Sequence, residues 1–296
     1  MSEHLVPPGT EPQRLDRYAL GVFAGLATVS HAYKAAKRGE LTVDGAPSEP
    51  QHRVRPGERL AFVGPARPPP PRWEMALDVP WEDDDLAAVV KPPGIAVSGN
   101  QHRTLEHALA GNLRPSAAPD ALPWARPVHR LDFRTGGLVL VAKSASARAA
   151  LGSMLEARAI SKRYRALLIG RLEGEGEIAE PLDERPCLSR WRAVAHHRSL
   201  RTDWLTTADL WPVTGRTHQL RRHALLLGHP VLGDDAYGIE GCVLRGQGLF
   251  LWALELRLPH PRSGEPLHVE IPEPPKFEAH RRREERRWAR WREGPR

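Results

Sequence analysis

Asp132 is a candidate catalytic residue, because basic residues surround it along the chain. It stands in the segment Arg-Pro-Val-His-Arg-Leu-Asp-Phe-Arg that begins at Arg126, directly before a Thr-Gly-Gly turn. Cations close to a carboxylate keep it ionised, and an ionised carboxylate can act as a nucleophile or as a base. The alternative, judged from the residues alone, is a salt-bridged aspartate in a loop.

A tyrosine stands in a second segment of interest, Ser-Lys-Arg-Tyr-Arg-Ala-Leu-Leu-Ile, which begins at Ser161. The pattern predicts a strand that opens at Tyr164, close to Lys162. On this local pattern alone, Tyr164 is a half-buried strand residue.

Basic side chains also crowd the first turns of a predicted helix over residues 217–227. The polar members of this group are Arg216, His218, Gln219, Arg221, Arg222 and His223. The N-terminus of a helix carries partial positive charge, so arginines there are unfavourable unless an anion or a carboxylate compensates them. We therefore expect a phosphate or a buried aspartate close to this helix.

Other kinds of reactive site find little support in the sequence. His218, His223 and His229 lack the spacing of zinc ligands and have no acidic or thiolate residue beside them. Cys187 has no base partner that would make it a nucleophile. Neither the phosphate-binding loop pattern nor the dinucleotide-binding pattern occurs, so we expect no metal and no cofactor.

The elements that must position these groups fall into two predicted domains. Apolar residues at helical spacing predict one helix from about Leu15 and a second over 29–37, and an Asp-Gly pair predicts the turn of a hairpin after them. A proline-rich stretch then predicts a stiff spacer. The expected order is a flexible N-terminus over 1–11, a compact helix–hairpin module over 12–64, a linker over 65–76, the main domain over 77–277, and a basic tail over 278–296 that is either a helix or disordered.

The main domain mixes strands and helices without regular alternation. Apolar runs and alternating patterns predict strands over 86–90, 137–142, 164–169, 205–213, 250–258 and 267–271, and helices over 104–112, 144–159 and 217–227. We therefore predict an α+β fold with a mixed, largely antiparallel central sheet flanked by helices and loops.

Composition narrows the class of protein further. The chain has 296 residues, a formal charge of +7 and only two cysteines, which excludes a disulfide scaffold and favours a reducing compartment. The positive charge is concentrated in two segments, because 12–64 and 278–296 each carry eight basic residues against five and four acidic ones. A polyanion such as nucleic acid is the partner that this charge favours. The start has no signal-peptide pattern and no apolar run is long enough to span a bilayer, so we expect a cytoplasmic protein without a membrane partner.

Taken together, the motifs resemble one family, the RluA-type pseudouridine synthases. The matching segments, in order, are Lys91-Pro-Pro-Gly94, His129 to Gly137, Lys162-Arg-Tyr164, Thr214 to Arg221, and Gly228 to Gly238. Two positions depart from the family pattern: Gly136 stands where serine is usual, and Arg222 stands where an apolar residue is common. The N-terminal module is similar to the αL-type RNA-binding module named after ribosomal small-subunit protein four.

The resemblance implies a reaction that breaks the N1–C1′ bond of a uridine, rotates the uracil and rejoins it through C5, without a cofactor. It implies that Asp132 is the catalytic carboxylate, that Tyr164 stacks on the uracil and accepts the C5 proton or only stacks, and that Arg221 pairs with Asp132. Whether Asp132 attacks C1′ or removes the 2′ proton stays open. Arg130 fills the space that the extruded base leaves. The other expected RNA-binding residues are His129, Arg134, Thr135, Arg216, His218, Gln219, Lys34, Lys37 and Arg38.

The expected substrate is large-subunit ribosomal RNA, with tRNA as the second choice, and no obligate protein partner is implied. Two other functions compete with this one. A non-catalytic RNA-binding or ribosome-assembly factor that kept the fold would lack Asp132, Tyr164 or Arg221, and all three are present. A nucleosidase that used Asp132 would release free uracil from RNA.

Overall fold

The computed structural model describes residues 2–23, 26, 28–63, 71–239 and 246–293. The chain divides into two compact units, Met1–Pro69 and Pro70–Arg296, and each is described here by itself. The division falls inside the segment expected to be a linker, of which residues 65–70 lie outside the described ranges. The Trp73 N–H donates to the His107 carbonyl (3.0 Å), so the end of that predicted linker is already part of the larger unit.

The smaller unit packs a helix pair on a short sheet. Its core consists of residues such as Leu15, Ala32 and Leu60, all fully buried. The Thr28 hydroxyl caps the second helix by accepting the His31 N–H. The elements are β1 (Ser2–Leu5), α1 (Leu15–Val22), α2 (Val29–Lys37), β2 (Leu41–Val43), β3 (Ala46–Pro47) and β4 (Arg59–Phe62), with the sheet order β1-β4-β2-β3.

One expectation for this unit is wrong, because part of the supposedly flexible N-terminus is a strand. Ser2–Leu5 pairs antiparallel with β4, and Val6 directly after it is 1% exposed. The pairing satisfies backbone groups along one edge of β4 that would otherwise lack partners. A strand of four residues without a clear apolar alternation gives little signal in the sequence.

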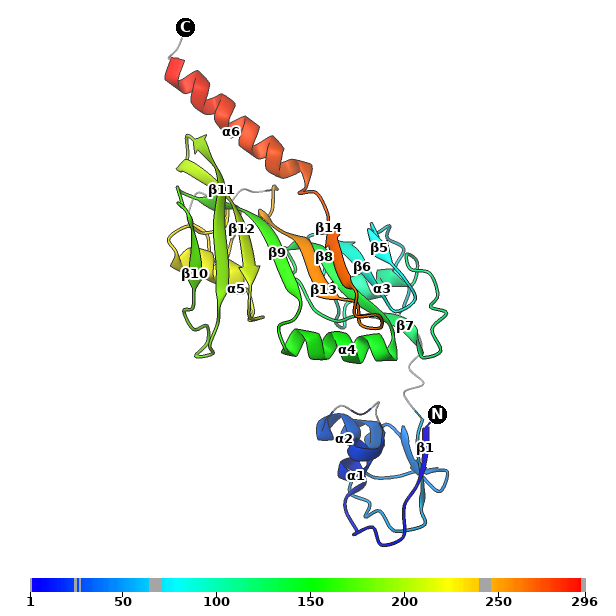
Figure 1. Ribbon diagram of the computed structural model, residues 1–296. Coiled ribbons are helices and arrows are strands. Elements are labelled where there is room, and N and C mark those ends of the chain that lie inside the picture. The colour runs from blue at the N-terminus through cyan, green and yellow to red at the C-terminus, as the bar shows by residue number, and fades with distance from the viewer. Residues whose placement is uncertain (1, 24–25, 27, 64–70, 240–245, 294–296) are drawn as a thin grey trace. The chain divides into compact units, whose positions relative to one another are not determined.

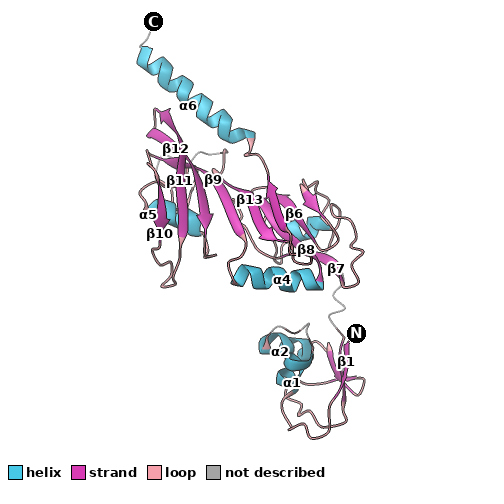
Figure 2. Ribbon diagram, viewed as in Figure 1, coloured by secondary structure: helices cyan, strands magenta, loops and turns pink. Residues whose placement is uncertain are grey.

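The larger unit is built on a ten-stranded sheet in the part that the structure describes, with the order β10-β11-β12-β9-β13-β8-β6-β5 and with β14 and β7 as side branches (Figures 1 and 2). Every strand pair is antiparallel except β13 with β8. The predicted α+β class with a largely antiparallel sheet is therefore confirmed. The strands are β5 (Trp81–Glu82), β6 (Leu86–Lys91), β7 (Ala121–Pro127), β8 (Gly136–Ser144), β9 (Ser161–Ile169), β10 (Glu175–Ile178), β11 (Ser189–Ser199), β12 (Asp203–Pro212), β13 (Leu251–Pro259) and β14 (Pro266–Glu270).

Helices cover both faces of the middle of this sheet, which explains its continuous apolar strands. On one face, Val89 and Val139 pack with residues of α3 (Leu105–Leu109) and α5 (Gln219–Leu226). On the other face, Leu138 and Leu140 pack with Leu151 of α4 (Ala145–Glu156). The ends of these elements that the sequence predicted mostly differ from the observed ends by only a few residues.

The segment predicted as a basic helix or a disordered tail contains a long helix, α6 (Pro275–Glu293). Proline at its first position suits a helix start, because that residue needs no N–H partner. Phe277 is fully buried against Phe250 (ring centroids 5.2 Å apart), which fixes the first turn of α6 to the sheet. None of the helices within the described ranges is long and apolar enough to cross a membrane.

Candidate active site

One pocket of the larger unit brings the three expected catalytic residues together. Asp132 lies in the loop between β7 and β8, Tyr164 in β9 and Arg221 in α5, and all three line this pocket. Arg130, Thr135, Lys162, Arg216, His218 and Gln219 line it as well. Residues that are far apart in the sequence therefore share one cleft, as the enzyme interpretation requires.

The Asp132 carboxylate faces an arginine and a histidine, neither of them at short ion-pair distance. Its oxygens lie 3.7 Å from Arg221 Nη1 and 3.9 Å from His218 Nε2, and 22% of the side chain is exposed. The Thr135 N–H donates to the Asp132 backbone carbonyl (3.1 Å) and closes the turn behind it. The carboxylate is consequently free to meet a substrate in the pocket.

Arg221 has a closer partner than the one expected. Its Nε and Nη2 donate to the two carboxylate oxygens of Asp234, both at 2.7 Å. Burial works against ionised Asp234, but the hydrogen bonds and charge of Arg221 lower the pKa of this carboxyl overall. Asp234 also accepts the Ala236 and Tyr237 N–H groups. The expected Arg221–Asp132 pair is thus present through Nη1 at 3.7 Å, but the bidentate pair with Asp234 is the shorter one. Asp234 is the buried aspartate that the crowded helix predicted.

Tyr164 is 8% exposed and stands in the middle of the sheet, between β12 and β13. Burial raises the pKa of its phenol, and the charge of Asp132 raises it further. The hydroxyl therefore stays protonated in the free protein. Burial also lowers the pKa of Lys162, two residues earlier on the same face of β9.

The lysine of the Lys-Pro-Pro-Gly segment supports the loop that carries Asp132. Lys91 is fully buried, and its Nζ donates to the carbonyls of Pro92 (2.8 Å), Ile95 (2.9 Å) and Phe133 (3.4 Å). Burial lowers its pKa to about 8, although the charge of Asp132 opposes this. Its ammonium ties the end of β6 to the residue after Asp132, a role that the motif alone did not reveal.

Three of the residues expected to contact RNA are used inside the protein. The Gln219 amide accepts from Thr214 and donates to the Leu188 carbonyl (both 2.8 Å), and its side chain is buried. His129 accepts the Leu140 N–H (3.0 Å), and desolvation, followed by the charge of Lys162, lowers its pKa to about 3. Thr135 is 2% exposed. Gln219 and His129 thus hold loops around the pocket, whereas the buried Thr135 hydroxyl, at the pocket, has no hydrogen-bond partner among the described residues.

The remaining expected contacts differ in their surroundings. The backbone of His218, a pocket residue, has φ +54, a left-handed conformation that is uncommon for residues other than glycine. Its Nδ1 lies 3.0 Å from the Tyr237 hydroxyl. Arg216 donates to the Pro186 carbonyl, and Arg134 pairs with Asp235 at 2.6 Å. In the smaller unit, Lys37 pairs with Glu49, Arg38 with Glu40, and Lys34 has no ion pair within the described ranges.

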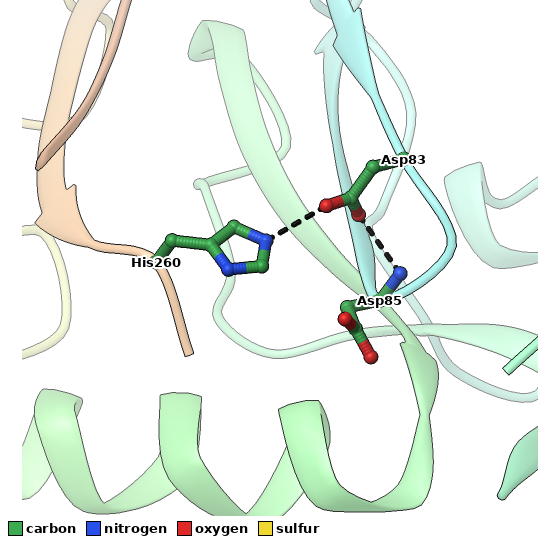
Figure 3. Close-up of side chains that lie close together, drawn as sticks. All are labelled: Asp83, Asp85 and His260. Atoms are coloured by element: carbon green, nitrogen blue, oxygen red, sulfur yellow. Dashed lines mark hydrogen bonds and ion pairs between the residues drawn. The ribbon is translucent and has the colours of Figure 1, made fainter. Parts of the chain in front are cut away.

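Within the described ranges, two groups of carboxylates and histidine have ligand atoms close enough together to hold a cation. In the first, His260 Nε2 lies 2.7 Å from Asp83, and Asp83 accepts the Asp85 N–H (2.8 Å; Figure 3). Arg262 already pairs with Asp85 and lowers its pKa. The second group is Glu255, His268 and Glu270, in which Arg163 and Arg257 pair with Glu255. In both groups arginine already neutralises a carboxylate.

A family model described as "RNA pseudouridylate synthase" matches residues 85–226, the segment that contains Asp132, Tyr164 and Arg221. The ribosomal large subunit pseudouridine synthase D of Vibrio vulnificus is 32% identical to this chain over 88% of both chains. The chain belongs to the RNA pseudouridylate synthase family. It is therefore an isomerase that converts uridine in RNA to pseudouridine.

Other relatives agree with this membership. The ribosomal large subunit pseudouridine synthase D of Nitrosomonas europaea is 37% identical over 68% of this chain, and that match spans 63% of the relative's own length. Among solved structures, human RNA pseudouridylate synthase domain containing 1 is 27% identical with a TM-score of 0.55, covering 67% of this chain and 84% of that one. The family's fold and this sheet are thus alike.

Proposed function

We propose that this synthase acts on large-subunit ribosomal RNA, with Asp132 as its catalytic carboxylate. The observation that carries the proposal is the single pocket that Asp132, Tyr164 and Arg221 line. The names of the two bacterial relatives described above support the ribosomal substrate over tRNA. The cytoplasm is the proposed location, since two cysteines in 296 residues suit a reducing compartment.

The reaction needs no redox partner and no group donor. The N1–C1′ bond breaks, the uracil turns, C5 bonds to C1′, and the proton on C5 leaves while N1 gains one. Asp132 serves either as the nucleophile at C1′ or as the base at the 2′ position, and both roles need its ionised form. The Arg221 guanidinium, 3.7 Å away, is the cation that faces this carboxylate.

The target uridine must leave its stack before it reaches the pocket, which costs a few kcal/mol. Arg130 lines the same pocket as Asp132 and is more exposed than Asp132. It is the group proposed to occupy the vacated space. Arg216 and His218 are proposed to contact the RNA strand at the pocket. The smaller unit, similar to the αL-type module, is proposed as a second RNA-binding site through Lys34 on α2, with Lys37 and Arg38 beside it.

The test is the Asp132→Asn variant. We expect it to abolish pseudouridine formation on ribosomal RNA while RNA affinity stays within about tenfold, because asparagine keeps the shape and loses the charge. Pseudouridine mapping of total RNA from a strain that lacks this chain then identifies the substrate. An active Asp132→Asn variant would falsify the catalytic assignment, and loss of pseudouridine from tRNA alone would contradict the ribosomal substrate.

A further inference from the structure

The C-terminal helix and the adjacent hairpin carry a row of stacked tryptophan and arginine side chains outside the catalytic pocket. The Arg198 guanidinium of β11 lies 3.7 Å from the ring centre of Trp204 in β12 and 4.9 Å from that of Trp288 in α6. The rings of Trp288 and Trp291 are 5.1 Å apart. Trp291 ends the row and is 63% exposed. These four residues are called the Trp–Arg row below.

Three acidic residues of α6, Glu278, Glu284 and Glu285, are engaged within the protein. Glu285 bonds to His197 and Glu284 to the Ser199 hydroxyl (both 2.8 Å), which attaches α6 to β11. Glu278 pairs with Arg281 and Arg282, one turn further along the helix. The side chains that hold α6 in place therefore include its carboxylates.

Three arginines of α6 face solvent without an ion pair in the described ranges. Arg286, Arg290 and Arg292 are exposed, and the described residues provide none of them with an ion pair. Arg198 in the Trp–Arg row is likewise exposed and without an ion pair in the described ranges. Arg198 lies against the ring of Trp288, and Arg290 and Arg292 flank the exposed Trp291 along α6. Unpaired positive charge next to exposed aromatic rings is the combination that binds single-stranded nucleic acid.

We propose that the Trp–Arg row and the three exposed, unpaired arginines of α6 (Arg286, Arg290 and Arg292) bind a single-stranded segment of the RNA substrate. An unpaired base stacks on Trp291, and Arg286 and Arg290 contact phosphates. Trp204 and Pro212 stand eight residues apart on β12, and Pro212 lines the catalytic pocket. This spacing separates the two places by roughly 26 Å along the strand. The RNA bound here is consequently not the flipped uridine but a second part of the same substrate.

This inference rests on the proposed function, because it takes RNA as the substrate, yet it is tested by binding rather than by turnover. The probe is a short fluorescein-labelled oligouridylate, titrated into the full chain at several salt concentrations and followed by fluorescence anisotropy. Pseudouridine formation on ribosomal RNA is measured separately, so a chain that binds the probe but forms no pseudouridine contradicts only the proposed function.

The first variant combines Arg286→Gln with Arg290→Gln. Two lost phosphate contacts should reduce the slope of log affinity against log salt by about 1.4, since each contributes about 0.7 on a single strand. The matched control is Arg103→Gln with Arg148→Gln, two exposed arginines of the same unit, and it should leave the slope unchanged. An equal change in the control would overturn the proposal.

The second variant tests stacking. Trp291→Ala should weaken probe binding roughly fivefold or more without a change in the salt slope, whereas Trp291→Phe should keep most of the affinity. Thermal unfolding followed by circular dichroism verifies that each variant is folded. Wild-type affinity in both the Trp291→Ala variant and the arginine double variant sinks the proposal, and a protein partner would then be the better candidate for this surface.

Discussion

At the scale of single residues, Arg221 joins two carboxylates of different environment. The Asp234 side chain is fully buried and takes two of its hydrogen bonds, whereas the partly exposed Asp132 faces the third nitrogen at 3.7 Å. A bidentate pair fixes the plane of a guanidinium. Asp234 therefore acts as a positioning residue, since it directs the charge that Asp132 needs.

The Asp234→Asn variant tests this role. A buried arginine that loses its charged partner should cost about 3 kcal/mol of unfolding free energy, and the loosened guanidinium should reduce the single-turnover rate at least about tenfold. Chemical denaturation and single-turnover kinetics measure the two effects. Asp235→Asn is the control, because Asp235 pairs with the half-exposed Arg134. Equal effects in both variants would refute the positioning role.

Tyr164→Phe separates stacking from proton transfer. Phenylalanine keeps the ring, so RNA affinity should hold, while loss of the hydroxyl should slow the single-turnover rate by about 100-fold if it moves a proton. Tyr18→Phe removes a hydroxyl that contacts His4 in the smaller unit and serves as the control. An unchanged rate in Tyr164→Phe leaves the ring with a stacking role only.

The sequence could predict Asp132 and the crowded helix because their neighbours are adjacent along the chain. It could not assign Asp234 to Arg221, since thirteen residues separate them and only the fold brings the two side chains together. Lys91 belongs to the Lys-Pro-Pro-Gly segment, but that segment did not predict its three carbonyl partners, because these come from two loops. Gln219 and His129 looked like contacts because polar groups that brace loops have the same composition as polar groups that bind RNA.

At the scale of elements, the parallel pairing of β13 with β8 explains why a glycine stands at position 136. A Cβ at this position would lie 2.3 Å from the Trp252 ring, so serine does not fit beside this tryptophan. At Gly137, with φ +114, a Cβ would lie 2.2 Å from the Ala253 carbonyl. The two glycines let β8, the strand that follows the catalytic loop, approach β13 closely.

The Gly136→Ser variant should consequently be less stable than the wild type. Overpacking against the indole should cost about 1–3 kcal/mol of unfolding free energy, and Trp252→Leu in the same chain should recover part of that loss. Denaturant titration of the single and double variants measures both. Gly152→Ser in α4 is the control, because a Cβ there meets nothing within 4 Å. A Gly136→Ser chain as stable as wild type would contradict the packing argument.

Periodicity predicted the elements that bury one or both faces, such as β6 and α4. It did not predict β11, whose segment Arg-Trp-Arg-Ala-Val-Ala-His-His alternates exposed and half-buried residues and reads as polar. This strand is held by its pairing with β12 and by α6 rather than by burial. Long-range partners of this kind leave no local pattern in a sequence.

At the scale of the whole molecule, the two units have separate hydrophobic cores, and we expect catalysis in the larger unit and additional RNA binding in the smaller one. One core cluster contains only residues between Val6 and Phe62, and the others contain none of these. The catalytic pocket lies entirely in the larger unit. The chemistry and the proposed RNA affinity of the smaller unit should therefore be separable.

A chain that begins at Pro70 should fold, because its core and sheet are complete without the smaller unit. It should keep the single-turnover rate at saturating RNA but bind ribosomal RNA at least about tenfold more weakly, with a smaller salt slope, since the phosphate contacts of the smaller unit are lost. In the full chain, Lys34→Gln should lower that slope slightly, whereas Glu11→Gln, at an exposed position outside its helices, should not. A truncated chain with wild-type affinity would show that the smaller unit does not bind RNA, and one with a slow rate at saturation would tie it to the chemistry instead.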